Sequence, residues 1–187
     1  MTVLDWLAVN FDLPVLEWIA ANLWNPVLDF FMPIITLLGD AGIFWIACSV
    51  VLMFIPKYRR AGIAMGAALL MGLLLCNLTL KPLVARIRPY DYQLQFFNKN
   101  IPLLIEAQHD FSFPSGHTIA SFEASVALAL RHKKLGIAAI ALAVLIAFSR
   151  LYLYVHYPTD VLASVVLGTG LAFLATFLVD KLWPKRV

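Results

Sequence analysis

Long apolar runs separated by short charged clusters constrain this chain more than any other feature of its sequence. A helix needs about 20 mostly apolar residues to cross the hydrocarbon core of a bilayer. Hydrophobic residues make up 62% of the 187 residues and charged residues only 13%, whereas a soluble domain needs more charge to cover its surface. The chain is therefore predicted to be an all-α, polytopic membrane protein.

Helix-breaking and basic segments divide the apolar sequence into six predicted transmembrane helices. Gly39-Asp40-Ala41-Gly42 separates the first pair, and Tyr157-Pro158 separates the last pair because proline suits the first turn of a helix. The predicted spans are residues 25–39, 42–56, 61–81, 115–131, 135–153 and 158–180. They form a predicted six-helix transmembrane domain over residues 25–187.

Residues 1–24 are predicted to form an amphipathic N-terminal helix outside this domain. Their apolar side chains recur on one helical face, with acidic residues elsewhere, as in helices that lie in the membrane interface. The residues of this face are Leu4, Ala8, Phe11, Val15 and Trp18. A longer first span that begins near residue 12 is the alternative.

The basic residues predict the orientation of the chain in a cell membrane. Nine of the 14 Lys and Arg residues fall on one side of the six-span arrangement, and the side richer in bases is expected to be cytoplasmic. These nine are Lys57, Arg59, Arg60, Arg131, Lys133, Lys134, Lys181, Lys185 and Arg186. Both termini are then cytoplasmic and segment 82–114 lies outside. The net charge of +3 is explained by basic clusters that set the orientation of the chain in the membrane. Nucleic acid is therefore not expected as a partner.

Charged residues and histidines on the other side break this pattern. Each one alone has an ordinary explanation, such as a base that reaches the headgroups or an acid that caps a helix. Together they fall at one depth near the membrane surface, where charges are costly without a partner or a function. These residues are Lys81, Arg88, His117, Arg150, His156 and Asp160.

The chemistry of this set suits a phosphate group. Three cations can neutralise a phosphate and the charge of its transition state, and Pro114-Ser115-Gly116-His117 adds a hydroxyl and a backbone N–H at a helix N-terminus, which favours anions. Two histidines can serve as nucleophile and acid. Asp160 lies four residues after His156, so its carboxylate can hold one ring nitrogen and leave the other free.

Three sequence motifs in this region resemble those of the type 2 phosphatidic acid phosphatase superfamily. The first is Lys81, six residues, then Arg88-Pro89; the second is Pro114-Ser115-Gly116-His117. The third is Ser149-Arg150, five residues, His156, three residues, Asp160. All three are intact and in order.

The resemblance implies a role for each matching residue. Lys81, Arg88 and Arg150 would bind phosphate oxygens, helped by Ser115 and the Gly116 backbone. His156 would attack phosphorus to form a phosphohistidine, Asp160 would orient His156, and His117 would protonate the leaving oxygen. The family uses no metal and no cofactor. Arg86 is additional to the motif and is expected at the membrane interface.

The expected substrate is a lipid phosphate or diphosphate presented at the outer face of the membrane. Undecaprenyl diphosphate is favoured, because recycling it requires a phosphatase at that face. Phosphatidylglycerophosphate, phosphatidic acid and the lipid A 1-phosphate are alternatives. Two other functional classes remain open. One is a metallohydrolase with His117, His156 and Asp160 as zinc ligands; the other is a transporter of phospholipid or isoprenoid phosphates that uses the basic cluster to bind headgroups.

Two further features carry expectations of their own. Segment 90–113 contains six aromatic residues, and a membrane-interface belt is favoured over a lid on the site. They are Tyr90, Tyr92, Phe96, Phe97, Phe111 and Phe113. Glu123 is six positions from His117 and is expected to face away from the site, held by a structural hydrogen bond.

Overall fold

The computed structural model describes residues 2–183, and every regular element in this range is a helix. The all-α prediction is confirmed. Predictions that involve Met1, Lys185 and Arg186 lie outside the described residues.

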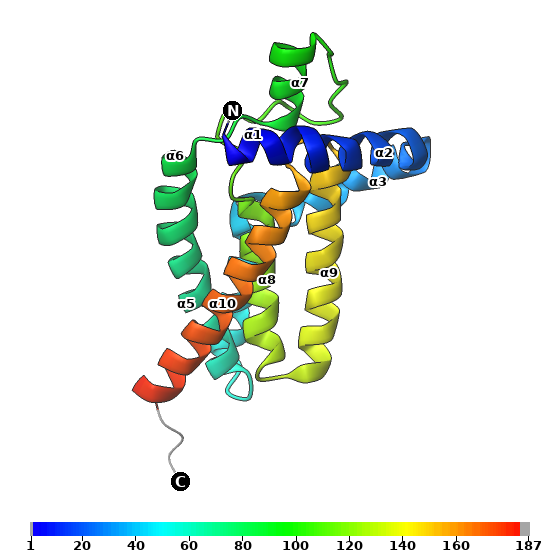
Figure 1. Ribbon diagram of the computed structural model, residues 1–187. Coiled ribbons are helices and arrows are strands. Elements are labelled where there is room, and N and C mark those ends of the chain that lie inside the picture. Colours follow the sequence, from blue (N-terminus) through cyan, green and yellow to red (C-terminus); the bar gives the residue numbers. More distant parts are fainter. Residues whose placement is uncertain (1, 184–187) are drawn as a thin grey trace.

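The N-terminal residues form a helical segment that lies across one end of the molecule (Figure 1). It consists of α1 (Val3–Leu7), the π-helix η1 (Ala8–Asp12) and α2 (Leu13–Leu23), which follow one another without a break. One face, including Asp12, Leu16 and Ile19, is buried, while Trp6 and Trp18 on the other side are more than half exposed. The buried face shares a core cluster with residues 152–155, so this segment packs directly on the rest of the protein.

The next two helices meet at a sharp turn. Asn25 caps α3 (Pro26–Leu37) by accepting hydrogen bonds from two backbone N–H groups. The 3-10 helix η2 (Asp40–Gly42) follows, with Ala41 and Gly42 at φ of 47° and 68°, and then α4 (Ile43–Phe54) begins. The predicted break at residues 39–42 is confirmed. However, α3 has 12 residues, only about 18 Å of helix, and runs across the same end as the N-terminal segment (Figure 1).

The remaining helices form a bundle around α8, which packs against α5, α9 and α10. The π-helix η3 and the short helix α6 follow α5 in the chain and continue in the same direction, and α7 lies beyond the end of the bundle (Figure 1). The bounds are α5 Arg59–Gly72, η3 Leu73–Leu80, α6 Lys81–Val84, α7 Pro89–Phe97, α8 Gly116–Ala129, α9 Lys133–Tyr152 and α10 Pro158–Leu182.

The six-span prediction is not confirmed. Within residues 2–183, four helical stretches are long and apolar enough to cross a membrane, and they support a membrane-embedded protein. They are Pro26–Phe54, Arg59–Phe97, Lys133–Tyr152 and Pro158–Leu182. The predicted span at 115–131 corresponds to α8, which has 14 residues and buries polar side chains such as Glu123 among its neighbours. Because other helices surround α8, it does not need an apolar surface.

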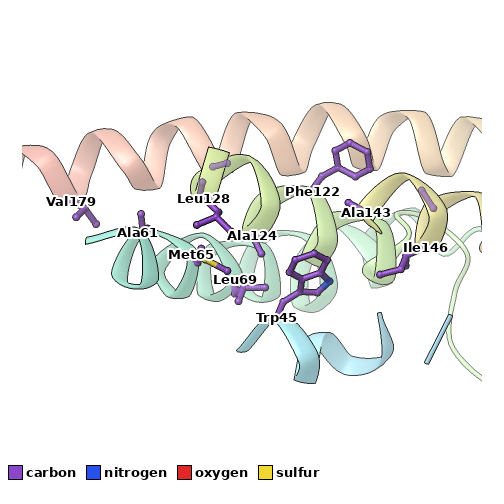
Figure 2. Close-up of a cluster of buried hydrophobic side chains, with 14 of the residues drawn as sticks. Trp45, Ala61, Met65, Leu69, Phe122, Ala124, Leu128, Ala143, Ile146 and Val179 are labelled. Carbon is purple, nitrogen blue, oxygen red and sulfur yellow. The ribbon is translucent and has the colours of Figure 1, made fainter. Parts of the chain in front are cut away.

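Small side chains let the helices of the bundle approach closely. The main core cluster combines large side chains such as Trp45 and Met65 with the alanines of α5 and α8 (Figure 2). A Cβ atom on Gly62 would lie 2.6 Å from the backbone oxygen of Ser49, so glycine is required where α5 crosses α4. Close packing through these small residues is the arrangement expected of helices in a membrane.

Ion pairs mark the two ends of the bundle. At one end, Asp180 near the end of α10 accepts hydrogen bonds from Arg60 and Arg131, at 3.1 and 3.0 Å. The N-terminal segment lies at the opposite end, where Asp12 contacts Arg86 and Thr159. The described N-terminal residues and the end of α10 are therefore at opposite ends (Figure 1). This arrangement does not confirm the prediction that both termini are cytoplasmic, which stays a prediction.

Candidate active site

A cavity at the end of the bundle nearest the N-terminal segment brings together most of the predicted site residues. Its volume is about 490 Å³. Ser115 and Asp160 do not line it but are completely buried. The predicted site residues that line it are Lys81, Arg88, Gly116, His117, Arg150 and His156. They come from the α6–α7 region, the start of α8, the end of α9 and the loop before α10.

His156 is held between a carboxylate and a guanidinium. Its Nδ1 is 3.6 Å from Oδ2 of Asp160, and its Nε2 is 3.3 Å from Nη1 of Arg88. Arginine can only donate a hydrogen bond, so Nε2 acts as the acceptor and the ring proton belongs on Nδ1, toward Asp160. At 3.6 Å from Asp160, Nδ1 has no hydrogen-bond partner among the described residues, and the lone pair of Nε2 faces Arg88, one of the cations that line the cavity.

Burial keeps this imidazole neutral. The side chain of His156 is 2% exposed, and burial lowers its pKa well below the usual value, with the charges of Arg88 and Arg150 lowering the pKa further. A neutral ring is the form that can attack an electrophile.

Arg88 and Lys81 share an anion that comes from the protein itself. Nη1 of Arg88 donates to the backbone oxygen of Val155 at 2.7 Å, and Nε donates to that of Asp110 at 2.8 Å. The carboxylate of Asp110 forms ion pairs with both Arg88 and Lys81. The two cations therefore converge on a single anion position.

Asp110 was not recognised in the sequence as part of the site. Burial raises the pKa of this carboxyl, but the hydrogen bond from Lys81 and the charge of Arg88 outweigh burial and hold the pKa well below its usual range. Asp110 is therefore ionised at neutral pH. Its position a few residues before the second motif was the only signal for it in the sequence.

Arg150 has unused hydrogen-bond donors. Its Nη1 donates to Oγ1 of Thr36 on α3 at 2.7 Å, but Nε and Nη2 have no partner among residues 2–183. The residue is 1% exposed. A buried guanidinium with free donors is costly unless a ligand completes it, so Arg150 is suited to bind an anion.

Ser115 supports the start of α8 from behind the cavity. Its backbone N–H donates to Oγ of Ser164 at 2.8 Å, and its own Oγ accepts a hydrogen bond from Thr118 at 3.0 Å. Gly116, the first residue of α8, lines the cavity. The backbone N–H of Ser115 is thus already used, and Gly116 is the better placed of the two to meet a ligand.

His117 faces the cavity across from the loop that carries His156. Its Nε2 is 3.9 Å from Oδ1 of Asp40 in the turn between α3 and α4. A Cβ atom on Gly39 would lie 2.8 Å from the His117 ring, so this turn can pass over the ring only because Gly39 lacks a side chain. Asp40 was also missed in the sequence.

Glu123 lines the same cavity as His117 and His156, so the expectation that it faces away from the site is wrong. The cavity continues between α4 and α5 along apolar side chains such as Leu69 and Leu73. A Cβ atom on Gly72 would lie 2.1 Å from Oε2 of Glu123, so the glycine makes room for the carboxyl. This oxygen has no hydrogen-bond partner within the described part of the chain, contrary to the expected structural hydrogen bond.

Arg86 is not at the membrane interface as expected. It is 6% exposed and pairs with both Asp12 and Asp160. Its guanidinium carbon lies 3.8 Å from the centre of the Tyr157 ring. Arg86 therefore belongs to the layer of residues directly behind His156.

The aromatic residues of segment 90–113 lie outside the cavity wall. Tyr90 and Tyr92 are buried, whereas Phe96 and Phe97 on α7 are more than half exposed. Gln108 and Asp110 are the residues of this segment that line the cavity. The segment thus contributes polar groups, and not an aromatic lid, to the site.

The arrangement does not resemble a metal centre. Nowhere in residues 2–183 do three His, Cys, Asp or Glu side chains form a group that could hold a metal ion. Asp160 is instead occupied by Arg86, the hydroxyl of Ser112 and the backbone N–H of Tyr157. The zinc set considered as an alternative, His117, His156 and Asp160, is therefore not such a group in the described part of the chain.

Fold and site define a class of helical, membrane-embedded proteins with an anion-binding cavity at one end of the bundle. Residues 61–184 match the family model of the PAP2 superfamily. The chain belongs to the PAP2 superfamily, and the family resemblance noted in the sequence is confirmed.

Individual relatives support the same assignment. The chain is 32% identical over 133 residues to an undecaprenyl-diphosphatase of Sulfolobus acidocaldarius, a match that covers 70% of this chain and 61% of that relative. The crystal structure of a transmembrane PAP2-type phosphatidylglycerolphosphate phosphatase from Bacillus subtilis has a TM-score of 0.70 and 28% identity, covering 92% of this chain and 86% of that one. The crystal structure of Aquifex aeolicus LpxE, at 24% identity, shares the fold, with a TM-score of 0.74 over 88% of this chain and 93% of that one.

Proposed function

We propose that this protein is a membrane phosphatase that removes a phosphate group from a lipid phosphate or diphosphate through a phosphohistidine intermediate. The observation that carries the proposal is the position of His156, with Nδ1 3.6 Å from Asp160 and Nε2 3.3 Å from Arg88, in a cavity that is also lined by Lys81, Arg150 and His117. A nucleophile, an orienting carboxylate, cations and a second histidine are the parts that phosphoryl transfer requires.

The reaction begins when the phosphate replaces the Asp110 carboxylate beside Lys81 and Arg88. Nε2 of His156 then attacks phosphorus, and a P–N bond forms as the P–O bond to the leaving group breaks. His117 donates a proton to the departing oxygen. Water next attacks the phosphohistidine, His117 takes up its proton, and inorganic phosphate leaves with His156 restored. Arg150 and the two other cations stabilise the charge of both transition states.

The cavity supports a lipid as the substrate. Its polar end holds the cations, and the rest extends between α4 and α5 past apolar side chains such as Ile46, Leu69 and Leu73. A phosphate headgroup would occupy the first part and the start of a lipid chain the second. Such a shape distinguishes an enzyme for amphipathic phosphates from one for small soluble esters.

Undecaprenyl diphosphate is the favoured substrate, with phosphatidylglycerophosphate, phosphatidic acid and the lipid A 1-phosphate as alternatives. Relatives named for the first two substrates both resemble this chain. The basic end of the bundle, with Arg60 and Arg131, is assigned to the cytoplasm, so the site and the N-terminal segment lie at the outer face. A lipid can then enter the site without leaving the bilayer.

Release of inorganic phosphate from purified lipids tests the proposal. The protein in detergent micelles is expected to release phosphate from at least one of the four candidate lipids, fastest from undecaprenyl diphosphate. Movement of labelled lipid between leaflets of proteoliposomes, without phosphate release from any of the four, would support the transporter alternative and overturn the proposal.

Chelation distinguishes the proposed route from a metal-dependent one. Because His156 and the three cations perform the chemistry, full activity is expected in excess EDTA, and vanadate is expected to inhibit by occupying the phosphate position. Both effects are measured as initial rates of phosphate release. Loss of activity in EDTA that added zinc restores would overturn the metal-independent mechanism.

Asp110→Asn is expected to lower KM roughly fivefold with little change in kcat. The substitution removes an internal anion that competes with the substrate for Lys81 and Arg88, an effect on the order of 1 kcal/mol for a partly exposed ion pair. Steady-state kinetics on the best lipid substrate measure the change. His109→Ala, on the exposed neighbour, serves as the control, and a raised KM in Asp110→Asn would show that Asp110 assists binding.

A further inference from the structure

We propose that Asp12 is a positioning residue for the reaction: through Arg86, it keeps Asp160 oriented and gives the carboxylate–guanidinium–carboxylate cluster behind His156 a net negative charge. This inference rests on the function proposed above. It assigns the N-terminal segment, which lies outside the region matched by the family model, an indirect part in the reaction.

Arg86 is the link between the two carboxylates. Its Nη1 donates to Oδ1 of Asp160 at 2.5 Å, and its Nη2 donates to Oδ2 of Asp12 at 2.7 Å. The guanidinium also lies over the ring of Tyr157, 3.8 Å from its centre. The planar guanidinium presents two donors in fixed directions, so the position of Asp12 determines where Arg86 meets Asp160.

Asp12 also holds the first turn of α10, the helix that carries Asp160. Its Oδ1 accepts the backbone N–H of Thr159 at 2.8 Å, and its Oδ2 accepts the Thr159 hydroxyl at 2.7 Å. The carboxylate therefore caps a helix from a different part of the chain. Asp12 is 0% exposed, and all of these contacts are made in the interior.

Packing alone does not explain this cluster. An apolar side chain at residue 12 would bury the same face, and a buried ion pair often stabilises a fold no better than apolar residues of similar size. The N-terminal segment nevertheless places its buried carboxylate against Arg86, the arginine that contacts Asp160 within residues 2–183. A role in the reaction explains why residue 12 is a buried aspartate and not an apolar side chain.

The balance of charge gives the physical reason. If Arg86 paired with Asp160 alone, its positive charge would cancel the carboxylate that faces His156. Asp12 supplies a second negative charge, so the three side chains together keep a net charge of −1. In an interior of low dielectric constant, this charge favours the positive character that His156 gains when its Nε2 attacks phosphorus.

Asp12→Asn tests the inference directly. The substitution keeps the size of the side chain but removes its charge and one acceptor oxygen, and kcat is expected to fall roughly tenfold, the effect of one weakened charge contact. KM is expected to stay within about twofold, because Asp12 does not line the cavity. Glu17→Gln is the matched control: it removes a carboxylate of the same N-terminal segment that pairs with Lys99 at the surface, and wild-type kinetics are expected.

A double-mutant cycle separates positioning from general damage to the fold. If Asp12 acts through Asp160, then Asp12→Asn lowers kcat in the wild-type background but causes no further loss in an Asp160→Asn background. A merely structural role predicts the same tenfold loss in both backgrounds, and that result would overturn the inference. If Asp12→Asn does not fold, Arg86→Lys takes its place in the cycle, since an ammonium group cannot hold both carboxylates in the same geometry.

The outcomes also separate this inference from the proposed function. If the wild-type protein releases no phosphate from any lipid, the proposed function fails. If the wild-type protein is active and His156→Ala is inactive, but Asp12→Asn behaves like Glu17→Gln, the proposed function stands and only the role of Asp12 is overturned.

Discussion

His156→Ala is expected to reduce phosphate release to the background rate, a loss of ~10⁴-fold or more, as when a covalent nucleophile is removed. No other described side chain lies in the same position: His156 is the group in contact with both Asp160 and Arg88. The cations that remain can still bind the phosphate, so KM for any residual activity should change little. Initial rates of phosphate release from the best lipid substrate measure the loss.

Trapping of the intermediate sharpens this expectation. When the wild-type protein is quenched in base during turnover of a phosphate-labelled lipid, the label is expected on His156, because phosphohistidine survives base but not acid. His109→Ala, which alters an exposed histidine of the α7–α8 loop, should label like the wild type. A variant His156→Ala that keeps a tenth of the activity, or that still accepts the label, would contradict the assignment of the nucleophile.

Much of the site could be predicted from the sequence because its residues sit at helix ends that local signals define. Pro158 places Asp160 in the first turn of α10, and Gly116 begins α8 just before His117. The short spacings within each motif thus set the positions of neighbouring site residues. The basic clusters defined one side of the predicted bundle, and the site residues were predicted to gather on the opposite side. The structure brings them to a single cavity.

The partners that come from distant parts of the chain could not be predicted. Asp12 and Arg86 are 74 residues apart, as are Arg86 and Asp160, and no periodicity connects them. Arg86 resembled an interfacial base because only its contacts show that it is buried between two carboxylates. Asp110 likewise lies in a loop without a repeating pattern, and its role follows from the cations around it.

Two errors came from treating each helix by itself. The apolar composition of α3 suits a membrane span and a helix that lies across the end of the bundle equally. Its actual direction follows from contacts such as the hydrogen bond between Thr36 and Arg150. The position of Glu123 around α8 was argued from helical angle alone. The cavity extends along α8 to the place where Gly72 leaves space for Glu123. Residues on different faces of α8 can therefore line the cavity at different points along the helix.

His117→Ala is expected to slow release from phosphatidic acid by roughly 10²–10⁴-fold, the usual contribution of a general acid. The leaving group there is an alkoxide, which needs a proton as the P–O bond breaks. The leaving group of an aryl phosphate is a stabilised phenolate, which needs less help from an acid. The same variant should therefore lose less than about tenfold in rate on such a substrate. His132→Ala is the matched control, because His132 packs against Tyr58, with ring centres 4.6 Å apart, and does not line the cavity.

A lipid diphosphate provides a further test of the role of His117. Its leaving group is a lipid monophosphate, which departs more readily than an alkoxide but carries negative charge next to the cations of the cavity. The loss in His117→Ala should therefore be no larger on the diphosphate than on the aryl phosphate, and much larger on phosphatidic acid, so that the logarithm of the loss rises with the basicity of the leaving group. An equal loss on all three substrates would show that His117 binds the phosphate and does not donate the proton.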